Sequence, residues 1–129
     1  MRKGAFTRRW FKPIPGHSGY WVNKKGRVFS IGRKVFLPWR DNIKGYPRVE
    51  LYKGGVRLRF FVHRLVAIVW VKNPDPKNKI EVNHNDWNRS NPHARNLCWM
   101  TSLENRHYNK KKPWAGAKKY INDNAPCPF

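Results

Sequence analysis

The strongest constraint on the fold lies in residues 47–62, where apolar and polar side chains alternate on both sides of a Gly-Gly pair. Alternation with a period of two separates the side chains onto two strand faces, and paired glycines between such runs are typical of a β-hairpin. One face of the predicted hairpin is apolar, and the other carries three arginines: Arg48, Arg57 and Arg59. We interpret this face as a nucleic-acid-binding surface, with a merely solvated sheet face as the alternative.

Shorter elements are predicted on both sides of the hairpin. Aromatic and β-branched residues interrupted by proline and glycine in residues 10–37 predict short strands and tight turns. Apolar residues in residues 62–70 recur with the spacing of a helix face, which predicts a short helix there. The Asn73-Pro74 pair then ends this helix and opens a loop.

The last third of the chain predicts a strand, a long polar loop, a second strand and a helix. The strands are expected at residues 80–82 and 97–100, with an asparagine-rich loop between them. Thr101 and Glu104 have the spacing of a capping box, in which each side chain bonds the other residue's backbone N–H group. A helix is therefore expected from about Ser102 to Lys112, where Pro113 ends it.

The charge balance indicates a polyanionic partner. The chain of 129 residues has 28 Lys and Arg against 7 Asp and Glu, a net charge of +21. Nucleic acid is the commonest partner for such a surface, because binding releases its counterions. An anionic membrane surface and simple solubility are the alternatives. Further phosphate contacts are expected from Arg89 and from a lysine run, Lys110, Lys111 and Lys112. No apolar run resembles a signal peptide or a membrane span, so we expect a cytoplasmic protein.

Candidate catalytic residues gather in residues 83–105. Phosphodiester hydrolysis needs an activated water and a cation beside the leaving oxygen. The imidazole of His84 can accept a proton from water, and the neighbouring Asn83 can bind a hard cation through its amide oxygen. Asn105, on the following helix, could reach the same cation, and Asn96 could hydrogen bond across the loop and hold the His84 ring. By residue type alone the set is also compatible with ordinary loop asparagines and a structural histidine.

A zinc site is the main rival interpretation of His84. Cys98 and His107 could join it, but three nitrogen and sulfur ligands without a fourth make a poor structural zinc site. His63 lies at a predicted helix start among apolar residues, and we interpret it as structural.

The motifs of this region resemble those of the HNH endonucleases of phages and their introns. They are V-N-H-N-D-x-N at residues 82–88, N-L-x-W-x-T at residues 96–101 and E-N at residues 104–105. Upstream, residues 62–67 resemble that family's lead-in, and residues 10–30 resemble the small N-terminal module that often precedes the HNH unit in homing-type members. The similarity covers most of the chain before its C-terminal tail.

The resemblance implies an α+β fold in which a small N-terminal antiparallel β-sheet is followed by a ββα-metal finger. The expected modules are a basic, DNA-binding sheet at residues 10–62, a helix and nuclease finger at residues 63–112, and a basic irregular tail at residues 113–129. The expected partner is double-stranded DNA.

The resemblance also implies metal-dependent DNA cleavage. His84 corresponds to the general base, Asn83 and Asn105 to the ligands of one divalent ion, Mg²⁺ or Mn²⁺, and Asn96 to the asparagine that braces the two-strand hairpin. A single site cuts one strand, so a monomer would nick and a weak dimer could cut both strands. Many relatives have Asp where this chain has Asn83, and this departure keeps a non-catalytic nucleic-acid-binding protein as the alternative. Trp87 stands where relatives often have glycine.

Overall fold

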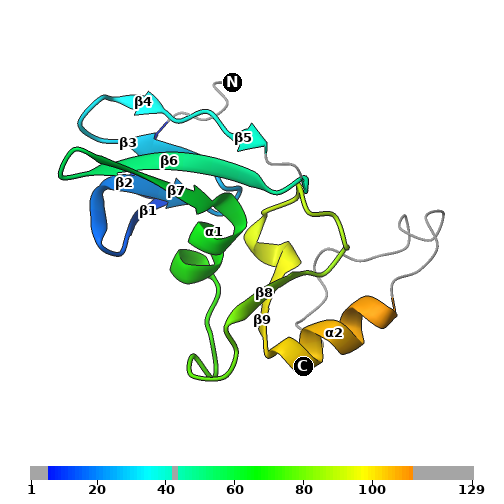
Figure 1. The fold of residues 1–129 in the computed structure, drawn as a ribbon. Helices are drawn as coiled ribbons and strands as arrows, with labels where there is room; N and C mark the ends of the chain where they lie inside the picture. The colour runs from blue at the N-terminus through cyan, green and yellow to red at the C-terminus, as the bar shows by residue number, and fades with distance from the viewer. Residues whose placement is uncertain (1–5, 42–43, 112–129) are drawn as a thin grey trace.

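The computed structural model describes residues 6–41 and 44–111 (Figure 1). Its elements in chain order are β1 (Phe11–Ile14), β2 (His17–Asn23), β3 (Val28–Ser30), β4 (Val35–Phe36), β5 (Arg40–Asp41), β6 (Pro47–Lys53), β7 (Val56–Phe61), α1 (Val62–Trp70), β8 (Glu81–His84), the 3₁₀ turn η1 (Ala94–Asn96), β9 (Leu97–Met100) and α2 (Ser102–Lys110). Within the described ranges the strands form antiparallel sheets of order β1-β2-β3-β4, β5-β6-β7 and β8-β9. The predicted α+β class is confirmed, with two N-terminal sheets where the sequence predicted one. Lys112 and the predicted tail lie outside the described residues.

The β6–β7 hairpin confirms the clearest sequence prediction. Its strands pair from Arg48 opposite Phe61 to Lys53 opposite Val56, and the turn between them is Gly54-Gly55. Both glycines have positive φ angles, 58° and 79°, which residues with a Cβ rarely adopt. The register therefore places the alternating side chains on the two faces that the sequence predicted.

Helix α1 joins the two N-terminal sheets to the C-terminal finger, which consists of β8, η1, β9 and α2. It begins directly after β7, as predicted, and contacts β1, β2, β6 and β7 as well as β8, η1 and β9. Figure 1 shows it between the sheets and the β8–β9 pair. Val62, Val66 and Ala67 on this helix are fully buried and belong to one hydrophobic cluster with Val49 of β6 and Leu97 of β9. The core is thus shared between the two predicted modules, whose boundaries stay a prediction.

The β2–β3 turn docks against the finger at Gly26. The backbone N–H of Ala94 in η1 donates to the Lys24 carbonyl at 2.8 Å, and the Trp39 indole donates to the Gly26 carbonyl at 2.9 Å. Gly26 has a φ of 90°, and a Cβ built on it would lie 2.6 Å from Cγ1 of Val62. Only glycine therefore fits both the backbone conformation and the packing at this junction.

We expect the substitution Gly26→Ala to destabilise the protein by about 2–4 kcal/mol, because it adds overpacking to the cost of a positive φ. Gly16 is the matched control, since it has a φ of 76° and a Cβ added there would meet no atom within 4 Å. Gly16→Ala should cost about 1 kcal/mol, the backbone contribution alone. Urea denaturation of both variants measures the difference, and equal losses would refute the close approach at Gly26.

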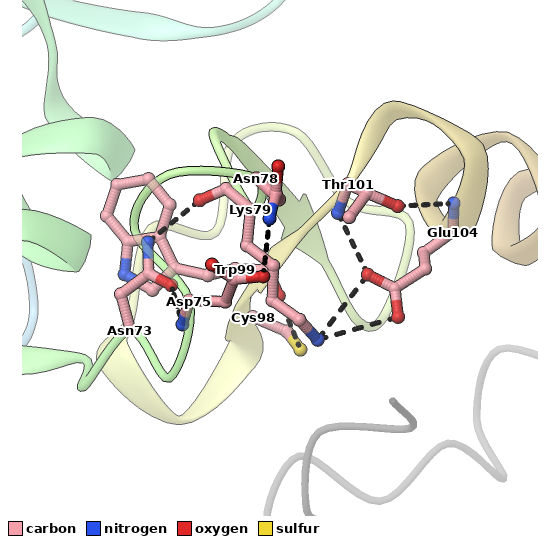
Figure 2. Close-up of polar contacts among 8 residues, drawn as sticks. All are labelled: Asn73, Asp75, Asn78, Lys79, Cys98, Trp99, Thr101 and Glu104. Carbon is pink, nitrogen blue, oxygen red and sulfur yellow. Dashed lines mark hydrogen bonds and ion pairs between the residues drawn. The ribbon is translucent and has the colours of Figure 1, made fainter.

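The C-terminal finger has the predicted order of strand, loop, strand and helix. The capping box is confirmed, because the Thr101 hydroxyl accepts from the Glu104 N–H and the Glu104 carboxylate accepts from the Thr101 N–H. Glu104 also pairs with Lys79 at 3.4 Å, which ties the loop before β8 to the start of α2 (Figure 2). The first strand starts at Glu81 rather than residue 80, and the helix ends at Lys110, slightly earlier than expected.

Candidate active site

A cavity of about 280 Å³ lies between the finger and the N-terminal part of the chain. It is lined by Tyr46, Val82, Asn83, His84, Trp87, Arg89, Asn105 and Asn109. The three residues predicted to act on one phosphodiester, Asn83, His84 and Asn105, therefore line the same cavity. Strand β8 provides the first two, and the second turn of α2 provides the third.

The two candidate metal ligands hold their amide groups in a similar way. Nδ2 of Asn83 donates to Oδ1 of Asn85 at 2.9 Å, and Nδ2 of Asn105 donates to Oε1 of Glu81 at 2.8 Å. The Asn83 Oδ1 accepts no hydrogen bond within the described part of the chain, and the Asn105 Oδ1 accepts one long bond, 3.4 Å, from Asn109. Amide oxygens are hard donors of the kind that Mg²⁺ and Mn²⁺ prefer, so the donor set fits a small divalent ion.

His84 is buried against aromatic rings. Its ring centroid lies 4.7 Å from that of His63 and 5.7 Å from that of Tyr46. Burial is the main cause that lowers the pKa of His84 to about 4; Asp86 opposes this shift and Arg89 contributes to it. The imidazole is consequently neutral at pH 7 and able to accept a proton.

His63 lies behind the candidate base and is buried, as the structural interpretation requires. Burial lowers the pKa of His63 to about 3, with smaller contributions from the neighbouring His84 and from Arg64. Both buried imidazoles would titrate near 6.5 in an unfolded chain, so the unfolded state binds more protons between that pH and their folded values. Stability should thus be complete above about pH 6.5 and should decrease as the pH falls.

We expect the free energy of unfolding, measured by urea denaturation in EDTA, to fall between pH 7 and pH 4 by about 1–3 kcal/mol for each buried imidazole. Replacing His63 by Leu should flatten this dependence, because one of the two titrating groups is removed. The control His107→Gln changes an exposed histidine and should leave the slope unaltered. An unchanged slope in the His63→Leu variant would contradict this account of the buried pair.

Asn96 is almost completely buried, and its side chain braces the loop between β8 and β9. Its Oδ1 accepts from the Asp86 N–H at 2.9 Å, while Nδ2 donates to Asp86 Oδ1 at 2.9 Å and to the Asn91 carbonyl at 3.0 Å. These bonds use both amide hydrogens, so Asn96 does not hold the His84 ring directly as we expected. The expectation of a hydrogen bond across the loop agrees with the geometry.

Glu81 is a contact of the site that the sequence analysis missed. One carboxylate oxygen accepts from Asn105, and the other accepts from the Ser102 hydroxyl. These hydrogen bonds lower the pKa of the Glu81 carboxyl, and the bond from Ser102 has the larger effect. Glu81 lies in a predicted strand, but nothing in the sequence indicated that its side chain contacts α2.

Trp87 forms part of the cavity wall through an unusual backbone conformation. Its φ is 57°, in the left-handed region that side chains with a Cβ rarely occupy. The indole stacks on Tyr108 of α2, with ring centroids 4.7 Å apart and planes inclined by 16°. The Tyr108 hydroxyl donates to the Asn85 carbonyl, so this aromatic pair links the β8–β9 loop to the helix.

The zinc interpretation finds no support in the described residues. His107 is exposed and does not line the cavity, whereas Asn105 does. Cys98 is buried in β9. Among the residues that the structure describes, no group of three or more His, Cys, Asp or Glu side chains is placed to hold a metal.

The arginine face of the β6–β7 hairpin also carries an acidic side chain. Arg48, Arg57 and Arg59 lie on one face, as predicted, and Glu50 lies among them. Its carboxylate pairs with Arg57 at 3.5 Å and Arg59 at 3.2 Å, and with Arg40 of β5 at 3.3 Å, a residue that the sequence analysis did not include. The register therefore partly compensates the positive charge of this face.

The other predicted phosphate contacts are distributed around the cavity. Arg89 lines it, donates to the Lys44 carbonyl at 3.3 Å and lies 5.3 Å from the Tyr46 ring centroid. Lys110 and Lys111 are exposed at the end of α2, directly after Asn109 of the cavity wall. Phe61 pairs with Arg48 across the hairpin, and the ring centroids of Phe61 and Tyr46 lie 5.7 Å apart. Basic side chains are thus present on the hairpin, in the cavity lining and at the end of α2.

Comparisons with known proteins find relatives among phage endonucleases. The DNA endonuclease I-HmuI of Bacillus phage SP01 is 38% identical over 96 residues, covering 74% of this chain and 54% of that protein. The H-N-H endonuclease F-TflI of Escherichia phage T5 is 33% identical over 123 residues, covering 92% and 59% of the two chains. A solved structure described as DNA binding and cleavage by the HNH homing endonuclease I-HmuI matches with a TM-score of 0.69 and 33% identity, covering 85% of this chain and 64% of that one.

The chain spans little more than half the length of these two curated relatives. No protein-family model matches it. Neither helix in the described ranges has the length and apolar character needed to cross a bilayer.

Proposed function

We propose that this chain is an HNH endonuclease that binds double-stranded DNA and nicks one strand at the cavity around His84, a proposal supported by its similarity to phage HNH endonucleases. The observation that carries the proposal is the convergence of Asn83, His84 and Asn105 on one cavity. Residues far apart in the chain meet there, and each has the chemistry that a phosphodiesterase needs.

In the proposed reaction the neutral imidazole of His84 takes a proton from a water molecule, and the resulting hydroxide attacks the phosphorus. Burial keeps this imidazole uncharged at pH 7. The bond between phosphorus and the 3′ oxygen breaks, the 3′ oxygen takes up a proton from water, and the products carry a 5′-phosphate and a 3′-hydroxyl. Asn96 acts on this step indirectly, because it fixes the loop that begins directly after His84.

Asn83 and Asn105 are the residues that would hold the divalent ion, Mg²⁺ or Mn²⁺. When bound, such an ion supplies positive charge that stabilises the leaving oxygen. Two neutral ligands provide little charge of their own, so we expect weak metal binding without DNA. A DNA phosphate oxygen would then strengthen binding of the ion.

The proposed path of the DNA follows the basic side chains. Arg48, Arg57 and Arg59 on the hairpin face would contact the duplex on one side of the scissile phosphate. Arg89 at the cavity and Lys110 and Lys111 after α2 would contact the backbone close to it. Lys112, outside the described residues, is proposed to extend this contact.

Nicking of supercoiled plasmid DNA tests the proposal. Incubation of the full chain with plasmid in Mg²⁺ should convert supercoiled DNA to open circles, and EDTA should prevent this. End labelling should then identify a 5′-phosphate at each nick. Plasmid binding without nicking in Mg²⁺ or Mn²⁺ would overturn the proposal in favour of a non-catalytic DNA-binding protein that keeps the finger as a scaffold.

A further inference from the structure

Three acidic residues lie near the cavity, and they make different contacts. Asp86 accepts hydrogen bonds from residues of its own loop. Glu104 caps α2 and pairs with Lys79 (Figure 2). Glu81 bonds the side chain of Asn105. Within the described residues, Glu81 is thus the carboxylate that contacts a candidate metal ligand directly.

We propose that Glu81 is a positioning residue that orients Asn105 and supplies the negative charge that a site of two neutral amides lacks. The inference rests on the proposed function, since it concerns the divalent ion of the same cavity. Glu81 would act through its hydrogen bond to a ligand and would not bind the ion itself.

Orientation follows from the chemistry of the contact. A carboxamide can turn by 180° about its last bond, which exchanges its oxygen and nitrogen. A carboxylate only accepts hydrogen bonds, so Oε1 of Glu81 at 2.8 Å selects the orientation with Nδ2 of Asn105 toward it. The Asn105 oxygen is then directed away from Glu81. The Ser102 hydroxyl, which donates to the second carboxylate oxygen, restrains Glu81 in turn.

Charge is the second contribution of Glu81. Arg89 lines the cavity, and Arg64 and Arg106 are close enough to Glu81 to interact with it electrostatically. A divalent cation entering such surroundings meets repulsion, and the amide oxygens of Asn83 and Asn105 carry no formal charge to offset it. A carboxylate that accepts a hydrogen bond from a ligand lowers this repulsion and polarises the amide, as residues that contact the ligands do in other metal sites.

Substitution by glutamine separates this role from simple packing. In the Glu81→Gln variant the side-chain oxygen can still accept from Asn105, but the negative charge is absent. If Glu81 only docks α2 on β8, this variant should bind metal as the wild type does. If its charge acts on the ion, the variant should bind metal more weakly while its fold is unchanged.

The experiment measures the affinity of the full chain for Mn²⁺ by isothermal titration calorimetry, with a non-cleavable DNA duplex present. We expect Glu81→Gln to weaken Mn²⁺ binding about 10-fold or more, in the range known for outer-shell partners. The matched control is Asp75→Asn, which makes the same change in net charge in the loop before β8, away from the cavity lining and the hairpin face, and its Mn²⁺ affinity should stay within about twofold of the wild type. Circular dichroism checks that both variants are folded.

Mg²⁺ titration of plasmid nicking gives the second readout. The Glu81→Gln variant should need about 10-fold more Mg²⁺ for half-maximal nicking, and saturating Mg²⁺ should restore most of the rate. Wild-type Mn²⁺ affinity in a folded Glu81→Gln variant would overturn the inference and leave the proposed nuclease intact, as long as the wild type nicks DNA. A wild type that neither binds Mn²⁺ nor nicks DNA would overturn both.

Discussion

Replacing His84 by alanine should lower the rate of plasmid nicking by about 10²–10⁴-fold, the usual contribution of a general base, while duplex binding stays within a fewfold of the wild type. The effect should be this large because the imidazole lines the same cavity as the two amide ligands, and no other histidine does so among the described residues. Single-turnover nicking in saturating Mg²⁺, together with an electrophoretic binding assay, measures both quantities.

The buried position of His84 calls for two controls. His107→Ala removes an exposed histidine of α2 and should leave nicking unchanged. Added imidazole should partly restore nicking in the His84→Ala variant, because truncation leaves a space of suitable size beside Tyr46 and His63. If folded His84→Ala protein nicked DNA at the wild-type rate, His84 would not be the base.

The substitution Asn96→Asp should unfold the finger or destabilise the protein by about 3 kcal/mol or more. The new carboxylate would lose both donated hydrogen bonds and would face the carboxylate of Asp86, which Nδ2 of Asn96 contacts at 2.9 Å. Burial to 1% exposure prevents water from screening this repulsion. Thermal denaturation measures the loss, and nicking should disappear with it because the loop after His84 is no longer held.

Asn88→Asp is the matched control in the same loop. The Asn88 side chain is exposed, and its oxygen accepts from the backbone N–H and the hydroxyl of Ser90, contacts that an aspartate can also make. We therefore expect a change below about 0.5 kcal/mol. Equal stability of the Asn96 and Asn88 variants would contradict the bracing role of Asn96.

Local patterns predicted most of the elements. Alternation around Gly54-Gly55 predicted the β6–β7 hairpin and its two faces, because strand faces depend only on neighbouring residues. The Thr101 and Glu104 spacing predicted the start of α2 for the same reason, since both capping bonds form within one turn.

Contacts between distant segments could not be predicted in this way. The sequence indicated no role for Glu50, and the pairing of β5, β6 and β7 places it among Arg40, Arg57 and Arg59. Glu81 and Asn105 are 24 positions apart, so their hydrogen bond depends on how α2 packs on β8. The tight packing of Gly26 against Val62 likewise exists only in the folded chain.

The candidate site shows the same division. The resemblance of the motifs to HNH endonucleases selected Asn83, His84 and Asn105, and the structure places all three on one cavity. Other side chains hold these three in place. Glu81 and Asn85 hydrogen bond the two amides, and the rings of His63 and Tyr46 pack against the imidazole. Such contacts leave no local pattern in the sequence.

A crystal structure of the chain with Mn²⁺ and a DNA duplex tests the central claim most directly. We expect one anomalous peak in the cavity, about 2.0–2.2 Å from the side-chain oxygens of both Asn83 and Asn105 and from a phosphate oxygen, with the His84 ring facing a water beside the phosphorus. A peak bound by His84 itself, or by residues outside this cavity, would contradict the claim.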